Sequence, residues 1–199
     1  VSLIGTWMQN VALNWLLFRL TGSPFMLGAA TFAGQIPIFI LAPVSGVIGD
    51  RFDRRKILIA VQCASMIQAF ILAGITLAGV VEAWHLIVLT FFLGIINAFE
   101  LPIRQALVFD LLDDKRDLPN AIALNSSLFN GSRLIGPAVA GMIVALAGEG
   151  ICFLINAFSY LASVSAFTAM KIRKTFREKK ESRVLADINE GIRYAAGSS

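Results

Sequence analysis

Seven consecutive residues, Asp50 to Lys56, carry six charges, and long uncharged segments flank them on both sides. No charged residue occurs from position 20 to 49, and none occurs from position 57 to 81. A helix needs roughly 20 apolar residues to cross a hydrocarbon core about 30 Å thick. Both flanking segments reach that length, so the charged stretch is predicted to be a short turn between two membrane helices.

The composition of the whole chain also indicates a membrane protein. Hydrophobic residues make up 57% and charged residues 15% of the 199 residues, whereas a soluble domain usually carries about 25% charged residues. The net charge of +4 does not indicate nucleic-acid binding, because the basic residues cluster at the ends of apolar segments. Cys63 and Cys152 lie within apolar segments and lack metal-ligand spacing. The sequence therefore predicts no disulfide framework, no metal site and no cofactor.

Six membrane spans are predicted, so the expected fold is all-α and polytopic. The spans cover about 1–20, 25–49, 56–79, 83–110, 118–147 and 150–170. Residues 1–170 are expected to form one six-helix transmembrane bundle. Because the first span begins at the first residue, its helix is expected to be truncated, and the chain to be a fragment of a longer protein.

Basic residues set the expected orientation of the spans. They gather in the turn after the second span, in the connection after the fourth and in the segment after the sixth. Positive charge accumulates in cytoplasmic loops, so the N-terminus and residues 171–199 are expected in the cytoplasm. Residues 171–199 are interpreted as a truncated linker, in which Val184, Leu185, Ile188 and Ile192 fall on one face of an amphipathic helix at the membrane surface. A solvated linker is the alternative.

Polar side chains recur at helical spacing within three of the predicted spans. They form stripes of Asn10 and Asn14 in the first span, of Asn97, Glu100 and Arg104 in the fourth, and of Ser126, Asn130 and Arg133 in the fifth. Polar groups inside a bilayer are costly and usually face a bundle interior or a water-filled cavity. Together with Gln35, the stripes predict a shared aqueous path. Hydrogen bonding between helices is the alternative.

Three charged residues in these stripes have alternative interpretations. Glu100 and Arg104 lie one turn apart, and they are expected to pair with each other or with the charged turn. Arg133 lies about 15 residues into its span, hence about 20 Å deep at 1.5 Å per residue. It is interpreted as a cation that faces a cavity, or else as the partner in a structural ion pair.

Asp50 lies at the carboxyl end of the second span, where the helix dipole disfavours an anion. It therefore needs a compensating partner, such as a nearby arginine or the N-terminus of another helix. A contact that forms and breaks here would favour one conformation over another. A solvated loop that only fixes topology is the alternative.

Small residues mark the fifth span, which contains Gly131, Gly136, Pro137 and Gly141. Glycines allow helices to approach closely, and a proline favours a bend. We expect a closely packed helix that seals the path toward the outer face, with simple small-residue packing as the alternative.

The charged turn resembles the signature loop between helices two and three of the major facilitator superfamily, usually written G-x-x-x-D-R-x-G-R-R-K. The residues that match are Gly46, Asp50, Arg51, Arg54, Arg55 and Lys56, while Asp53 replaces the second glycine. Gly136, Pro137 and Gly141 resemble the helix-five antiporter motif, G-P-x-x-G-G, with Ala140 in place of a glycine. Segments 97–105, 118–125 and 152–157 are similar to the branch that contains the enterobactin exporter and related bacterial drug effluxers.

The resemblance implies a twelve-helix protein of two six-helix bundles, of which this chain is the N-terminal one, in the bacterial plasma (inner) membrane. It implies that the turn latches the outward-open state, that Asp50 touches the C-terminal bundle, and that the helix-five motif goes with export. The arginine of the family's helix-four motif would fall at Thr90. Proton coupling is therefore expected to depend on Arg133 or Glu100 instead.

Together, these patterns predict a secondary active exporter of a small organic solute, either a drug or a siderophore, driven by the proton gradient. The expected partners are the solute, the lipid bilayer and the second bundle, and no nucleic acid. The residues expected to line the path are Asn10, Asn14, Gln35, Asn97, Asn130 and Arg133. A non-transporting membrane scaffold or receptor is the alternative. No enzyme is predicted, because the sequence contains no HExxH, no GxSxG and no paired aspartates within the spans.

Overall fold

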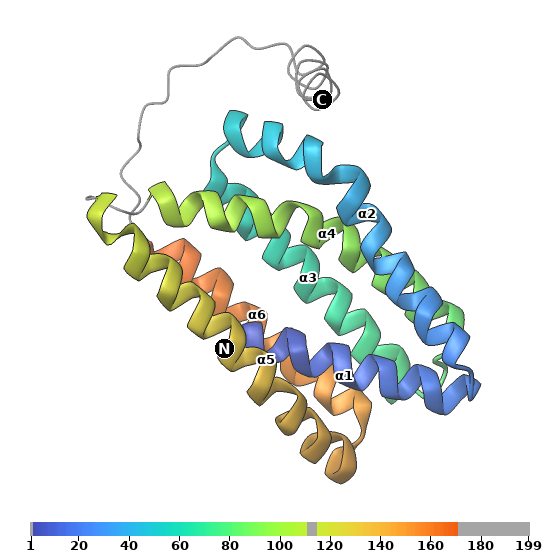
Figure 1. The fold of residues 1–199 in the computed structure, drawn as a ribbon. Coiled ribbons are helices and arrows are strands. Elements are labelled where there is room, and N and C mark those ends of the chain that lie inside the picture. Colours follow the sequence, from blue (N-terminus) through green and yellow to red (C-terminus); the bar gives the residue numbers. More distant parts are fainter. Residues whose placement is uncertain (1, 111–114, 171–199) are drawn as a thin grey trace.

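The computed structural model describes residues 2–110 and 115–170. Long helices account for nearly all of them (Figure 1): α1 (Ser2–Thr21), α2 (Pro24–Arg51), α3 (Arg54–Leu77), α4 (Ala83–Asp110), α5 (Leu118–Ala147) and α6 (Glu149–Ala169). A short 3-10 turn, η1 (Lys115–Asp117), precedes α5. The predicted all-α fold is confirmed for these residues, and each helix begins and ends within two residues of its predicted bounds.

Five of these helices are long and apolar enough to cross a membrane, namely α2, α3, α4 over Ala83–Val108, α5 and α6. The 20-residue helix α1 is not among them, because Gln9, Asn10, Asn14 and Arg19 dilute its apolar residues. The six crossings and the bundle boundary at residue 170 therefore stay predictions. The predicted amphipathic helix lies outside the described residues.

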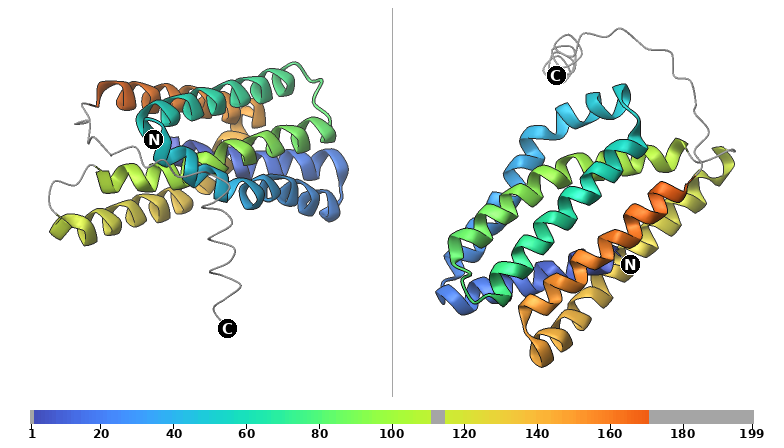
Figure 2. Two further views of the ribbon diagram at one scale, coloured as in Figure 1. Left: turned by 90° about the horizontal axis from the view of Figure 1, so that it is seen from above. Right: turned by 180° about the vertical axis from the view of Figure 1, so that it is seen from behind.

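The helices pack mainly against partners distant in the sequence. α2 packs on α4, α3 packs on α6 and α4, and α1 packs on α5 and α6. Figure 2 shows α3 and α6 side by side, although more than 70 residues lie between them in the sequence. The largest apolar cluster is centred on α1, where Ala12, Leu16 and Leu17 are fully buried against Leu72 of α3 and Phe153 of α6.

One residue, Gly148, connects α5 to α6, and its φ of 83° lies in the left-handed region that favours glycine. The reversal brings Glu149, at the start of α6, next to the last turn of α1. There Arg19 Nη2 lies 2.9 Å from Glu149 Oε2, and the Glu149 carboxylate is almost fully buried. This ion pair ties the ends of α1 and α6 together at the side opposite the charged turn.

Helices α2 and α4 approach each other closely at two glycines. A Cβ atom placed on Gly94 of α4 would lie 2.2 Å from the Gly34 carbonyl oxygen of α2. On the other side, a Cβ on Gly34 would lie 3.0 Å from Thr90 Cγ2. The atoms that oppose Gly94 are backbone atoms of Gly34, so the α2–α4 contact requires glycine at position 94.

Candidate functional site

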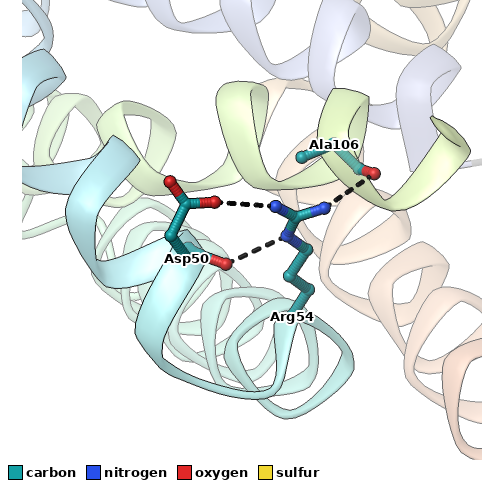
Figure 3. A network of polar contacts seen from close by, with 4 residues as sticks. Asp50, Arg54 and Ala106 are labelled. Carbon is teal, nitrogen blue, oxygen red and sulfur yellow. Dashed lines mark hydrogen bonds and ion pairs between the residues drawn. The ribbon is translucent and has the colours of Figure 1, made fainter. Parts of the chain in front are cut away.

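The charged turn is held together by Arg54, the first residue of α3 (Figure 3). Its guanidinium donates hydrogen bonds from Nη2 to Asp50 Oδ1 at 2.9 Å, from Nε to the Gly49 carbonyl at 2.9 Å and from Nη1 to the Ala106 carbonyl at 3.0 Å. The Arg54 side chain is 11% exposed, whereas that of Asp50 is 68% exposed. Arg54 therefore joins the start of α3 to the end of α2 and to α4. The prediction that an arginine compensates Asp50 at this helix end is confirmed.

Asp53 occupies the position where the family pattern has glycine, and it serves as the N-cap of α3. Its Oδ1 accepts hydrogen bonds from the backbone N–H groups of Arg55 at 3.0 Å and Lys56 at 3.4 Å. Its backbone, with φ of −62° and ψ of 107°, is extended. The turn thus needs no left-handed residue here, and the aspartate satisfies N–H groups that a glycine would leave to water.

Arg55 connects the same turn to the end of α6. Its guanidinium donates from Nε to the Phe167 carbonyl at 2.6 Å and from Nη2 to the Thr168 carbonyl. These carbonyls belong to the last turn of α6, where a cation is favourable. Through Arg54 and Arg55, the turn holds the neighbouring ends of α2, α3, α4 and α6.

The other residues of the family pattern are exposed in the turn. The side chains of Arg51 and Lys56 are exposed, and so is Gly46. A Cβ on Gly46 would meet no atom within 4 Å, so the described residues do not explain a need for glycine at this position.

The residues predicted to line a path lie on the outside of the described helices rather than between them. Asn10, Asn14, Gln35, Asn130 and Arg133 are exposed, and Asn97 is half-buried. Asn14 Nδ2 donates to the Asn10 carbonyl at 2.9 Å, a bond within α1. The shared path that these six residues are predicted to line stays a prediction.

Arg133 does have a specific environment on this exposed surface. Its guanidinium carbon lies 5.7 Å from the centre of the Trp7 ring of α1. The Trp7 and Phe129 rings in turn contact each other in an edge-to-face arrangement, with ring centres 5.8 Å apart. A cation over an aromatic face is favourable, so Trp7 and Phe129 hold Arg133 at the junction of α1 and α5. The sequence analysis did not include Trp7.

Close packing of α5 against α1 explains the glycine at one position of the helix-five motif, Gly136. A Cβ on Gly136 would lie 2.5 Å from Trp7 Cβ and 3.2 Å from the Ile4 carbonyl oxygen, so α5 approaches α1 closely there. The neighbouring Pro137 lies inside α5, and Ala140 is buried. For Gly131 and Gly141, an added Cβ would meet no atom within 4 Å, so neither makes a close approach to the other described helices.

A network of hydrogen-bonded polar side chains, which the sequence analysis did not predict, is buried inside the bundle. Gln9 of α1 lies at its centre: Gln9 Nε2 donates to Gln68 Oε1 at 3.0 Å, and Gln9 Oε1 accepts from Asn156 Nδ2 at 2.7 Å. Gln68 Nε2 donates to the Leu89 carbonyl at 3.3 Å, and Ser159 Oγ lies 3.1 Å from Asn156 Oδ1. The network links α1, α3, α4 and α6. The spacing of Gln62, Ser65 and Gln68 along α3 was the sequence signal for it.

Glu100 and Arg104 form the pair that their spacing predicts. Arg104 Nη1 lies 3.2 Å from Glu100 Oε1, and both side chains are largely buried. Among the described residues, no group of three or more His, Cys, Asp or Glu side chains is placed to hold a metal ion.

Replacing Gln9 by leucine is expected to lower the free energy of unfolding by about 1–3 kcal/mol, the usual loss when a buried polar partner goes unsatisfied. The loss arises because Gln68 Oε1 and Asn156 Nδ2 both lose their partner. Titration of the full-length protein with a denaturing detergent measures it. The control is Asn14→Leu, an exposed amide of the same helix with one local bond, and it should change stability little. Equal effects of the two substitutions would contradict a structural role for the buried network.

Known proteins with similar sequences are bacterial transporters. The chain is 30% identical over 183 residues to the staphyloferrin A transporter of Staphylococcus aureus, a match that covers 92% of this chain and 46% of the relative. It is 29% identical over 146 residues to macrolide efflux protein A of Streptococcus pyogenes, covering 73% of this chain and 36% of the relative. It is 23% identical over 198 residues to the multidrug efflux pump Tap of Mycolicibacterium fortuitum, covering 96% of this chain and 48% of the relative.

The chain spans about half the length of the curated relatives it matches. All three relatives are named as transporters or efflux proteins, and none as an enzyme. The family model described as "transmembrane secretion effector" matches residues 1–199, which is the whole chain. This match agrees with the five apolar helices and with the charged turn between α2 and α3. The chain is therefore a multi-pass membrane protein that belongs to the transmembrane secretion effector family of the major facilitator superfamily.

Proposed function

We propose that the full-length protein is a secondary active exporter of a small organic solute in the bacterial plasma membrane. Residues 1–170 form its N-terminal bundle of six membrane-crossing helices, and residues 171–199 form a cytoplasmic linker to a second bundle. The relatives support export in general, since they are named for staphyloferrin A transport, macrolide efflux and multidrug efflux. The coverage of about half of each relative supports a missing second bundle.

The exposed polar surface of α1 and α5 is the observation that carries this proposal. Arg133 lies 15 residues from the start of α5 and 14 residues from its end, so it is near the middle of the helix. A central arginine that faces lipid costs about 2.5–3.5 kcal/mol on insertion scales, and the exposed amides of Asn10, Asn14 and Asn130 add to this. The cost is avoided if this surface faces a hydrated lumen between two bundles.

In this half of the protein, the residues proposed to line the lumen are Asn10, Asn14, Gln35, Asn97, Asn130 and Arg133. We add Trp7 to them because its ring lies against the Arg133 guanidinium. Gly136, Pro137 and Gly141 shape its outer seal, where α5 packs on α1 at Gly136. The charged turn, consisting of Gly46, Asp50, Arg51, Arg54, Arg55 and Lys56, acts as the conformational latch. The exposure of Asp50 and Gly46 supports a contact between this turn and the second bundle.

Transport by the full-length protein in inverted membrane vesicles tests the function. Vesicles containing the protein are expected to accumulate at least one solute of a panel of dyes, macrolides and siderophores when a proton gradient is applied. Vesicles without the protein, and vesicles with the gradient collapsed by an ionophore, serve as controls. Accumulation of no solute above these controls would favour a scaffold or receptor instead.

Cysteine labelling tests the proposed lumen separately in the same preparation. In a background with Cys63 and Cys152 replaced by alanine, cysteines at Asn14 and Asn130 should react with a membrane-impermeant thiol reagent. A cysteine at Leu134, which is 79% exposed in the middle of α5, serves as the apolar comparison. If Asn14 and Asn130 react no faster than Leu134, the polar surface does not line a hydrated path.

A further inference from the structure

The guanidinium of Arg133 keeps its hydrogen-bond donors available on the exposed surface of α1 and α5. An arginine carries five N–H donors in a planar fork. The attraction of this cation to the face of the Trp7 ring, 5.7 Å from the guanidinium carbon, is electrostatic and occupies no acceptor atom. Among the described residues, no ion pair and no hydrogen bond engages the Arg133 side chain. The aromatic contact therefore fixes a cation whose donors are unused.

The two helices that form this surface supply no counter-charge. The only charged side chain of α1 is Arg19 and the only one of α5 is Arg133, so neither helix contains an acidic residue. Arg19 is paired with Glu149 at the far end of α1. A charged side chain near the middle of a membrane helix is costly, and it usually pairs with an opposite charge or faces water. The anion that balances Arg133 must therefore come from a bound solute or from the second bundle.

The surroundings of Arg133 suit a carboxylate that is attached to an aromatic or apolar body. The guanidinium fork matches the two oxygens of a carboxylate, and such bidentate pairs are strong and specific in geometry. Asn130, three positions earlier on α5, is exposed and adds amide donors. The Trp7 and Phe129 rings supply the apolar surface, and Phe129 is 37% exposed. An apolar lining with a few polar groups is typical of sites for small molecules.

We propose that Arg133 determines the specificity of the exporter by binding a carboxylate of the solute, so that the exported class is organic anions with an aromatic or apolar body. Trp7 is the positioning residue, because its ring holds the guanidinium that binds the anion. This inference rests on the proposed function, in which the surface of α1 and α5 lines the lumen. A solute that carries only positive charge would be repelled by Arg133.

Calorimetric titration of the full-length protein in lipid nanodiscs tests the anion site without any gradient or transport. The probes are salicylate, naphthoate and fluorescein, each compared with its own methyl ester at neutral pH, and nanodiscs without protein are the blank. At least one carboxylate should bind about tenfold or more tightly than its ester, because a charged bidentate pair replaces a neutral hydrogen bond. If no carboxylate binds more tightly than its ester, the proposal is wrong.

Substitutions at Arg133 show whether this preference arises at the proposed site. In Arg133→Gln, the carboxylate should bind only as tightly as the ester, whose own affinity should stay unchanged and so report an intact site. Arg133→Lys should recover only part of the preference, because an ammonium group is a point charge without a fork. Arg116→Gln, which removes the same charge from η1, is the matched control and should keep the full preference. A preference that persists in Arg133→Gln would place the carboxylate elsewhere and overturn the proposal.

Substitutions at Trp7 test its positioning role through the ratio of carboxylate to ester affinity. Trp7→Phe keeps an aromatic face for the guanidinium and should keep most of the ratio. Trp7→Leu removes that face and should lower the ratio several-fold, since a cation over an aromatic ring is stabilised by the ring. If the ratio in Trp7→Leu equals that of the wild type, Trp7 does not position Arg133.

An acidic residue of the second bundle is the competing partner for Arg133. Such a residue would satisfy the guanidinium in the protein itself, and no probe pair would then show a carboxylate preference. Arg133→Gln would instead unfold at a clearly lower temperature than the wild type, because the acidic residue would lose its partner. This pair of results would overturn the proposal.

Transport separates this inference from the proposed function. If carboxylate binding requires Arg133 but the vesicles accumulate no solute, export fails and the anion-binding site stands. If the vesicles accumulate carboxylates and esters equally well, in the wild type and in Arg133→Gln alike, the inference fails and export stands.

Discussion

Replacing Gly94 by alanine is expected to disrupt the packing of α2 on α4 and to destabilise the whole bundle. The new Cβ would lie 2.2 Å from the Gly34 carbonyl oxygen and 3.0 Å from its carbonyl carbon. These are backbone atoms, so no rotamer change relieves the clash, and the helices must move apart. Overpacking of a well-packed contact costs about 1–3 kcal/mol, and we expect a loss at the upper end of this range.

The thermal unfolding of the full-length protein in detergent, followed by size-exclusion chromatography, measures this effect. Gly94→Ala should unfold at a lower temperature and yield less monodisperse protein than the wild type. Gly74→Ala is the matched control, because a Cβ at this position in α3 would meet no atom within 4 Å. In a helix interior such a change usually stabilises by up to about 1 kcal/mol. Similar unfolding temperatures for the two variants would show that α2 and α4 do not cross at Gly94.

The Gly34–Gly94 contact illustrates what the sequence could not predict. The lengths of apolar segments and the charges between them predicted every helix of the described residues within two residues of its bounds. A membrane helix, however, is apolar on all sides, so no amphipathic pattern marks the face that meets a neighbour. Gly34 and Gly94 lie 60 positions apart on different helices, and nothing in the linear pattern pairs them.

The same limit explains the mixed outcome for the polar residues. Spacing alone predicted that Glu100 pairs with Arg104, because residues four apart on a helix are neighbours. It could not distinguish Asn10, which is exposed, from Gln9, which is buried in the centre of the network. The two residues are adjacent, and only the packing of α1 against α3 and α6 decides which of them faces inward.

More could be predicted of the charged turn, because some of its contacts join residues that are close together in the sequence. The predicted compensation of Asp50 by an arginine involves residues four positions apart. The cap at Asp53 is equally local, although it was not predicted. The bonds of Arg54 to Ala106 and of Arg55 to Phe167 depend instead on where α4 and α6 end. Those contacts give the turn a structural role that no local pattern reveals.

Replacing Arg54 by alanine is expected to reduce export by the full-length protein by more than tenfold. Arg54 donates to Asp50, Gly49 and Ala106, and hydrogen bonds from a charged donor contribute about 1.5–3 kcal/mol each. Loss of even one such bond from a single conformational state shifts its population by about tenfold, since 1.4 kcal/mol corresponds to a factor of ten. Arg54→Lys should restore little, because an ammonium group cannot reproduce the forked geometry of three donors.

Initial rates of solute uptake into inverted vesicles, at equal protein content, measure this loss. Hydrogen–deuterium exchange should also increase at the neighbouring ends of α2, α3 and α4, where Arg54 binds. Lys56→Ala is the matched control, because Lys56 is exposed in the same turn and its removal deletes the same single positive charge. A turn that only fixed membrane topology through its charge would respond alike to both substitutions. Lys56 belongs to the proposed latch as an exposed charge, whereas the Arg54 guanidinium holds three helix ends together. Export should therefore fall far more in Arg54→Ala than in Lys56→Ala.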